Sequence, residues 1–477
     1  MAASILSPFS LLEEPKLSFS PVPGKSEDVN PLRGLVRFGP YTQLSFSQHT
    51  PAIRILTVGP RSGWKHRVDL LKSLEGAHNP TERTEYVPSY PGFEAVFRAG
   101  LRAAPRDLHI QWPDSLGELA QSGSPQAKLL TLLESTIATL DAIKHEFDVA
   151  LVHFPDSWDP VTRARGFDAH DVLKAMAARR GIATQVVNDS TFQFKYRAAL
   201  AWRLGIALYV KAAGVPWKLS RVPGVPEDTA YIGVAYALRE NNSHFVTCCS
   251  QVFDADGGGM EFVAFEARDP MENINEARRN PYLSRDDMRA VLTRSLASHQ
   301  KRNGGRLPKR LVVHKTTAFR EEELDGVFDA TAGVSQLDCL EVSARGSWRG
   351  VWLVPSDDPD VPSVPSNYPV PRGTVLARSG TSALVWVAGN APKASTKPDF
   401  YQGGKSIPRP VSLTRYAGQG PLELAALEAI AMSKMDWNND ALYDPLPVTI
   451  LYSQRLARTI ANVPDLPGSA YAYRLFM

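Results

Sequence analysis

The stretch "LGIALYVKAAGVPWKLS" (residues 204–220) predicts a helix that ends within it. Its apolar residues recur at helical spacing, Gly214 is placed to end the helix, and Pro216 prevents the helix from resuming. Lys211 falls on the same face as Leu208, where its ammonium group would leave water. Such a cation needs a partner anion, unless its long side chain reaches back to solvent.

The sequence before this helix alternates between strands and helices. Short apolar runs predict buried strands at 52–60, 148–155 and 182–187, and amphipathic patterns predict helices at 124–147 and 169–181. This order predicts an α/β domain, in which helices cover a parallel sheet. Residues 1–33, rich in proline and serine, are expected to form an irregular arm.

The pattern changes after Gly214. A plausible boundary loop at 219–229 is followed by alternating runs on either side of the glycine triplet 257–259, which is typical of a hairpin. The proline-dense segment 354–373 predicts a surface loop. The remaining predicted elements are strands at 230–240 and 310–319 and helices at 285–304, 421–438 and 446–463.

Composition limits the class of protein. The chain has 477 residues, of which 43% are apolar and 22% charged, so we expect two large globular domains. A net charge of only +3 excludes a histone-like polycation but allows a local basic groove. Three cysteines without a C-x-x-C pair, no secretion signal and no apolar run of about 18 residues indicate a cytoplasmic protein that does not span a membrane.

Three segments of the first predicted domain offer polar groups to one place. His170 and Lys174 are four residues apart and share a helix face, Gln185 lies on the next strand, and Lys211 is the misplaced cation. No carboxylate is expected near them. Two ammonium groups, an imidazole and an amide would then be stable together only around a multiply charged anion such as phosphate.

The order of these pieces resembles the MID domain of Argonaute proteins. The resemblance implies that His170, Lys174, Gln185 and Lys211 bind the 5′-phosphate of a guide strand. His170 stands where a tyrosine is more usual, and Ala213 stands where the family often has glycine. The resemblance also implies a Rossmann-like MID domain over 34–222, after an N-terminal arm over 1–33, and an RNase H-like PIWI domain over 223–477.

The second half is similar to a PIWI domain that has lost its cleavage site. Ala235, in "YIGVAYAL", and Thr316, in "VVHKTTAF", occupy the positions where slicing members carry Mg²⁺-binding aspartates. The resemblance therefore implies an inactive nuclease. Four acidic residues lie near the remaining positions of the family's metal site, and they are interpreted as solvated loop carboxylates: Glu261, Glu266, Asp436 and Asp440.

The end of the chain supports the same resemblance. "SKMDWNNDALYDPLPVTILYSQRLA" (433–457) resembles the final PIWI segment, and no PAZ or N-domain stretch is recognised before residue 34. The resemblance therefore implies the short prokaryotic Argonaute architecture. In that family the chain end lies between the two domains, so the terminal carboxylate of Met477 is expected to help hold Mg²⁺ at the guide phosphate.

The resemblance implies a groove for the guide and its paired target. Phe192, Phe194 and Tyr196 are candidates for stacking on the first guide base, with core packing as the alternative. The basic candidates for the groove are Lys301, Arg302, Arg306, Lys309, Arg310, His314 and Lys315, although the 301–310 run could equally be a solvated helix end.

A nuclease-dead Argonaute needs another protein in order to act. The resemblance implies a guide RNA, a single-stranded DNA target and an APAZ-containing effector, preferably SIR2-like and alternatively TIR, in an assembly that could form higher oligomers when activated. The effector would deplete NAD and cause abortive infection in defence against plasmids or viruses. Two other hypotheses remain: an active guided nuclease with displaced carboxylates, and a metabolic enzyme or single-strand binder that uses no guide.

Overall fold

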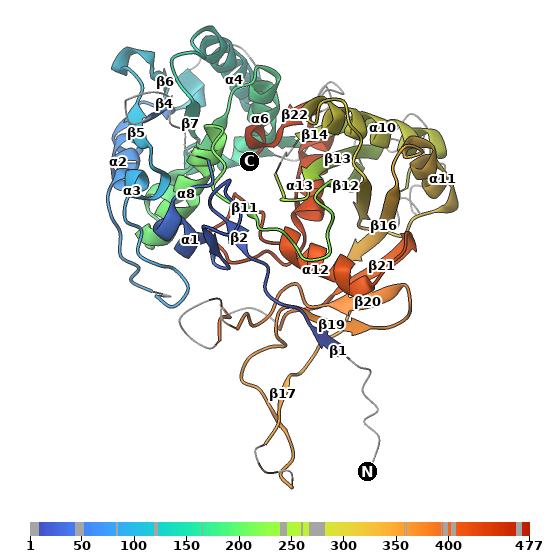
Figure 1. The fold of residues 1–477 in the computed structure, drawn as a ribbon. Helices are drawn as coiled ribbons and strands as arrows, with labels where there is room; N and C mark the ends of the chain where they lie inside the picture. Colours follow the sequence, from blue (N-terminus) through green and yellow to red (C-terminus); the bar gives the residue numbers. More distant parts are fainter. Residues whose placement is uncertain are drawn as a thin grey trace.

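Two β-sheets with their own helices lie side by side in the computed structural model (Figure 1). The N-terminal half of the chain forms most of one sheet, and the C-terminal half forms most of the other. The structure describes residues 9–42, 52–82, 84–118, 123–164, 166–238, 246–258, 261–266, 282–356, 358, 360–392, 394, 399–401, 407–463 and 470–477.

The first sheet has five strands in the order β10-β7-β4-β5, with β6 also paired to β4, and all its pairs are parallel. Ile55 and Leu56, neighbours on one strand, belong to different apolar clusters, because successive side chains point to opposite faces. Helices therefore cover both faces, as the sequence predicted. The strands and main helices are β4 (Ala52–Pro60), β5 (Gly100–Ala103), β6 (Ile110–Trp112), β7 (Val149–His153), β10 (Thr184–Val187), α2 (Trp64–Glu75), α3 (Phe93–Phe97), α4 (Pro125–Ala142), α6 (Ala169–Arg179) and α8 (Arg197–Lys211).

The second sheet has ten strands in the order β1-β19-β20-β21-β16-β15-β12-β13-β14-β22. Its centre is mixed, because β12 pairs in parallel with β15 and antiparallel with β13. The antiparallel pair β13–β14 confirms the predicted hairpin. Its strands and helices are β12 (Thr229–Leu238), β13 (Val246–Asp254), β14 (Glu261–Glu266), β15 (Arg310–Lys315), β16 (Gln336–Ser343), β19 (Thr374–Ala377), β20 (Ser382–Val385), β21 (Val411–Ala417), β22 (Ala470–Ala472), α10 (Arg285–Arg302), α11 (Glu321–Ala330), α12 (Leu422–Met432) and α13 (Val448–Asn462).

Residues 9–33 are only in part the irregular arm that the composition of 1–33 predicted. β1 (Phe9–Leu11) is the end strand of the ten-stranded sheet, and β2 (Leu17–Ser18) pairs with both β3 (Glu27–Asp28) and β11 (Lys218–Leu219). Because α1 (Pro31–Phe38) spans residue 33, the boundary expected after that residue falls inside a helix. Tertiary pairing orders this segment despite its prolines and serines.

The other described elements are short. They are α5 (Asp159–Thr162), α7 (Asp189–Phe192), β8 (Arg163–Ala164), β9 (Phe167–Asp168), β17 (Leu353–Val354), β18 (Val364–Pro365) and the 3-10 turns Arg106–Leu108, Leu116–Glu118, Asp156–Trp158 and Tyr473–Leu475. Within the described residues, no helix combines the length and the apolar character needed to cross a bilayer.

Helix α13 packs closely on the ten-stranded sheet at Gly233. Ser453 of α13 donates a hydrogen bond to the main-chain oxygen of Gly233 at 2.9 Å. A Cβ atom on Gly233 would lie 1.9 Å from the main-chain oxygen of Thr449, which is also on α13. Only glycine therefore allows α13 to pack on β12 at this distance.

We expect Gly233→Ala to destabilise the protein by about 2 to 3 kcal/mol, because the added methyl group pushes α13 off the sheet. Thermal unfolding of the full chain measures this. Gly380→Ala is the matched control, since a Cβ there meets no atom within 4 Å, and it should change stability by less than about 0.5 kcal/mol. Equal melting temperatures for the two variants would contradict the packing described.

Candidate anion-binding site

Two buried lysines extend from different helices of the first sheet. Lys174 lies on α6, which begins where Asp168 accepts hydrogen bonds from the main-chain N–H groups of His170 and Asp171. Lys211 is the last residue of α8. The side chains are 1% and 0% exposed, so neither reaches back to water. The solvent-reaching alternative for Lys211 is therefore wrong.

Both amines bind the same atom. The Nζ atoms of Lys174 and Lys211 each donate to the main-chain oxygen of Met477 at 2.5 Å, and Lys174 also donates to the main-chain oxygen of Thr184 on β10. Met477 is the last residue of the sequence and is itself 8% exposed. The C-terminal segment thus lies at the amine pair and supplies the acceptor that holds Lys211.

Burial makes the charged form of this pair costly. It lowers the pKa of Lys174 to about 8, and it lowers the pKa of Lys211 well below its usual value, where the charge of Lys174 adds to the effect. Two like charges at one acceptor favour an anion that can accept several hydrogen bonds at once. The geometry can therefore bind a phosphate or a carboxylate.

The other two residues of the predicted cluster lie differently. His170 is exposed, and its Nδ1 is 3.4 Å from Oδ1 of Asp171, so the structure does not bring it to the amines. Gln185 lies beside Thr184 on β10, and its Nε2 donates to the oxygen of Val186 at 2.9 Å. Within the described part of the chain, its buried Oε1 has no hydrogen-bond partner.

Sequence reasoning missed two residues that fix this site. Arg474 donates from Nη1 to the main-chain oxygen of Lys211 at 2.8 Å and so attaches the C-terminal segment to α8. Asp171 accepts a hydrogen bond from Thr459 of α13 at 3.0 Å, which ties α6 to the other sheet's helix. The only signal for Arg474 in the sequence was its position as a lone arginine inside the apolar ending "YAYRLFM".

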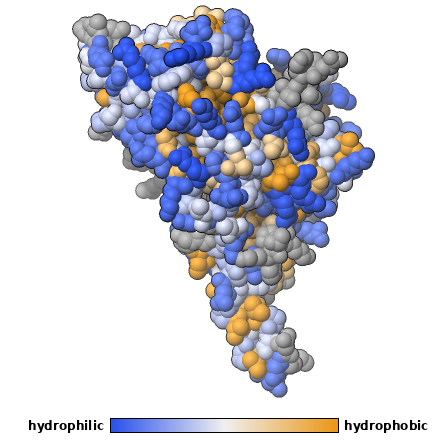
Figure 2. Space-filling model, turned by 90° about the vertical axis from the view of Figure 1, so that its left-hand side faces the viewer, coloured by the Kyte–Doolittle hydropathy of each residue, from blue (hydrophilic) through white to orange (hydrophobic). Residues whose placement is uncertain are grey.

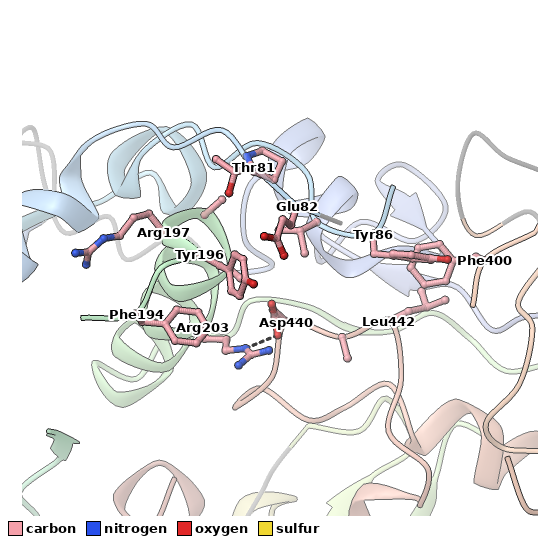
Figure 3. A pocket seen from close by; sticks show the side chains of 15 residues that line it. Thr81, Glu82, Tyr86, Phe194, Tyr196, Arg197, Arg203, Phe400, Asp440 and Leu442 are labelled. Atoms are coloured by element: carbon pink, nitrogen blue, oxygen red, sulfur yellow. Dashed lines mark hydrogen bonds and ion pairs between the residues drawn. The ribbon is translucent and has the colours of Figure 1, made fainter. Parts of the chain in front are cut away.

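The aromatic candidates lie at the far end of α8. Phe194 and Tyr196 line a cavity of about 250 Å³ beside Arg203 and Asp440 (Figure 3), while Phe192 packs edge-on against His153 with ring centroids 4.8 Å apart. The 15 residues of α8, at about 1.5 Å each, separate them from Lys211 by roughly 20 Å. They do not stack at the amine pair.

The two positions that lack carboxylates are neighbours in space. Val234 of β12 pairs with Lys315, the last residue of β15, so Ala235 is the next residue on β12 and Thr316 is the residue that follows the adjacent parallel strand. Ala235 is buried and has only a methyl group to offer. Neither side chain supplies an anionic oxygen.

The nearby acidic residues are not simple solvated carboxylates, which corrects their interpretation. Asp436 is buried, accepts a hydrogen bond from Tyr452, and lies beside Asp444, whose pKa burial and the Asp436 charge raise to about 8. Asp440 accepts from Nε of Arg203 at 2.7 Å. Glu261 accepts from Ser298. The side chain of Glu266 lies outside the described residues.

The basic groove candidates divide by burial. Lys301, Arg306 and Lys309 are exposed, and Arg302 is partly buried with its Nε 4.0 Å from Glu261.

Three candidates are inside the protein, which corrects their assignment to a groove. Arg310 forms ion pairs with Glu428 and, at 2.8 Å, with Asp338. Lys315 pairs with Glu323, and burial lowers the pKa of His314 to about 3.

We expect Glu428→Ala to destabilise the protein by about 3 kcal/mol, because it leaves the buried Arg310 guanidinium with one carboxylate partner fewer. Thermal unfolding again measures the effect. Asp329→Ala is the control, since its partner Arg285 is exposed and such pairs contribute less than about 1 kcal/mol. A loss no larger than the control's would mean that Arg310 is available for other contacts.

No protein-family model matches this chain, and no curated protein matches its sequence. Solved Argonaute structures do match its fold. The Argonaute of Clostridium butyricum, bound to a guide DNA and a 19-mer target DNA, is 14% identical with a TM-score of 0.70, over 99% of this chain and 55% of that one. The A. aeolicus Argonaute is 13% identical with a TM-score of 0.60, over 99% and 56%.

A third structure, Aa-Ago with externally bound siRNA, gives 13% identity and a TM-score of 0.59, over 98% of this chain and 56% of that one. The chain thus spans just over half the length of these proteins. The predicted α/β class is confirmed. The chain has an Argonaute fold, with MID and PIWI domains that are Rossmann-like and RNase H-like respectively.

Proposed function

We propose that this protein is a nuclease-inactive, guide-binding Argonaute subunit of a cytoplasmic prokaryotic defence system. The observation that carries the proposal is the convergence of Lys174 and Lys211, both buried, on one oxygen atom. A guide's 5′-phosphate brings two negative charges and three acceptor oxygens to such a pair, enough to keep both amines protonated. Gln185 completes this phosphate site, and His170 has at most a peripheral part.

A magnesium ion fits this site together with the phosphate. The buried Oε1 of Gln185 has no partner among the described residues, and phosphate oxygens cannot donate to it, whereas a cation or its water can. Gln185 and the terminal carboxylate of Met477 would hold the ion. Its charge would offset that of the guide's first phosphates.

The proposed guide is RNA, and the proposed target is single-stranded DNA. In the Clostridium butyricum neighbour, guide and target are both DNA. Base pairing would read the target sequence while the protein contacts the backbone. The exposed Lys301, Arg306 and Lys309 support a backbone contact beside β15, which a solvated helix end would not require.

Because Ala235 offers no ligand atom and the neutral hydroxyl of Thr316 is a poor substitute for a carboxylate, the proposed protein recognises its target without cutting it. The response would come from an APAZ-containing effector, SIR2-like by preference and TIR as the alternative. That effector would deplete NAD and stop the invaded cell.

We expect Lys174→Ala/Lys211→Ala to weaken retention of a short 5′-phosphorylated RNA by about 100-fold or more, since two charged hydrogen bonds are lost. Filter binding of labelled RNA to the purified chain at fixed salt measures retention. Lys65→Ala/Lys72→Ala on α2 removes the same charge from exposed positions and should change it less than threefold.

The wild-type chain tests the same site without a substitution. It should prefer a 5′-phosphate over a 5′-hydroxyl RNA of identical sequence, whereas a general single-strand binder would retain both equally. Undiminished loading in the double variant would refute the phosphate site.

We expect no cleavage when the guide-loaded protein is incubated with a complementary target and Mg²⁺ or Mn²⁺, because two metal ligands are missing from the strands that should carry them. Denaturing gel electrophoresis of end-labelled target reads this out. A cut opposite the centre of the guide would favour the alternative of a nuclease with displaced carboxylates.

A further inference from the structure

One projecting segment carries many of the exposed apolar side chains. Seven of the fifteen large apolar residues that are exposed in the described structure lie between residues 348 and 368. Figure 1 shows this segment extending from the body at β17, and Figure 2 shows apolar residues on the projection. The seven are Trp348, Val351, Leu353, Val354, Val361, Val364 and Tyr368, 40% to 67% exposed.

The projection cannot bury these side chains by itself. β17 and β18 form a two-stranded sheet of their own, with two residues in each strand and Val354 opposite Val364. An isolated hairpin of this size is marginally stable in water. A cluster of exposed apolar side chains on such an element marks a contact with another molecule.

The base of the projection is anchored to the ten-stranded sheet. Trp352 contacts Phe9 of β1 edge-on, with ring centroids 5.5 Å apart, and packs on a small core formed by Val370, Leu384 and Trp386. Phe9 is itself 55% exposed. β1 ends the strand order, so its outer edge has no partner strand among the described residues. An exposed apolar side chain at the sheet edge thus contacts the base of the projection.

The charge of residues 349–372 indicates which kind of molecule would bind the projection. Between Arg349 and Arg372 the sequence has no lysine or arginine, and it has three aspartates at 357, 358 and 360. A nucleic-acid backbone would be repelled there. A protein groove that is apolar at its floor and lined by lysine or arginine at its rim would complement the segment.

We propose that the β17–β18 hairpin and the β1 edge form the docking surface for the effector protein. This inference rests on the proposed function and adds the surface through which the partner binds. The partner covers the hairpin with an apolar groove, and its basic rim faces the exposed Asp358 and Asp360.

The test is co-expression of the full chain with an APAZ-containing effector protein, followed by affinity measurement on the purified complex. Val351→Asp/Leu353→Asp/Val364→Asp should weaken the complex by about 100-fold or more, since charges would enter a desolvated contact. Val22→Asp/Val36→Asp/Phe328→Asp, at exposed apolar positions elsewhere, should leave it within threefold. Melting temperature and 5′-phosphate RNA retention are measured on every variant.

The outcomes separate the docking surface from the guide function. Weaker partner binding with unchanged melting and RNA retention supports the proposal. An unchanged complex overturns it, as does a wild-type homodimer that the hairpin variant dissolves, because the occupant would then be a second copy. The proposal is also overturned if the wild-type chain forms no complex with the effector. Intact RNA retention in that case would show that guide binding does not depend on the docking surface.

Discussion

Two ammonium groups buried at one main-chain oxygen impose the strongest constraint on this molecule. An isolated charge inside a protein costs several kcal/mol, so Lys174 and Lys211 can remain charged only if acceptors are delivered to them. The acceptors come from Thr184 on a neighbouring strand and from Met477 at the other end of the sequence. The fold must therefore bring the last residues of the chain to the helices of the first sheet.

That requirement joins the two halves of the structure. β22 pairs with β14 in the ten-stranded sheet, and the residues after it cross to α6 and α8, where Arg474 attaches them to the end of α8. The hydrogen bond between Asp171 and Thr459 adds a second link. An anion bound at the amines would therefore contact elements of both halves.

Basic residues that are close together in the sequence have different environments in the structure. Lys309 is exposed, whereas Arg310 and Lys315, which follow it closely in the sequence, are buried in ion pairs. Strand β15 runs through the middle of the sheet, where its side chains meet helices on both faces. Some cations of a basic run are therefore buried in ion pairs that stabilise the fold, and others remain available to a partner. The elements that pack against each residue determine to which group it belongs.

The sequence by itself determined the α/β order, the parallel first sheet, the hairpin after β13 and the anomalous position of Lys211 on an apolar helix face, because periodicity and residue identity are local properties. Tertiary structure alone decided that His170 turns to solvent, that the N-terminal residues become sheet strands, and that Asp436 and Arg310 are buried. Each of these depends on contacts with residues distant along the chain. The burial of a charge is set by what packs against it, and local sequence does not encode that neighbour.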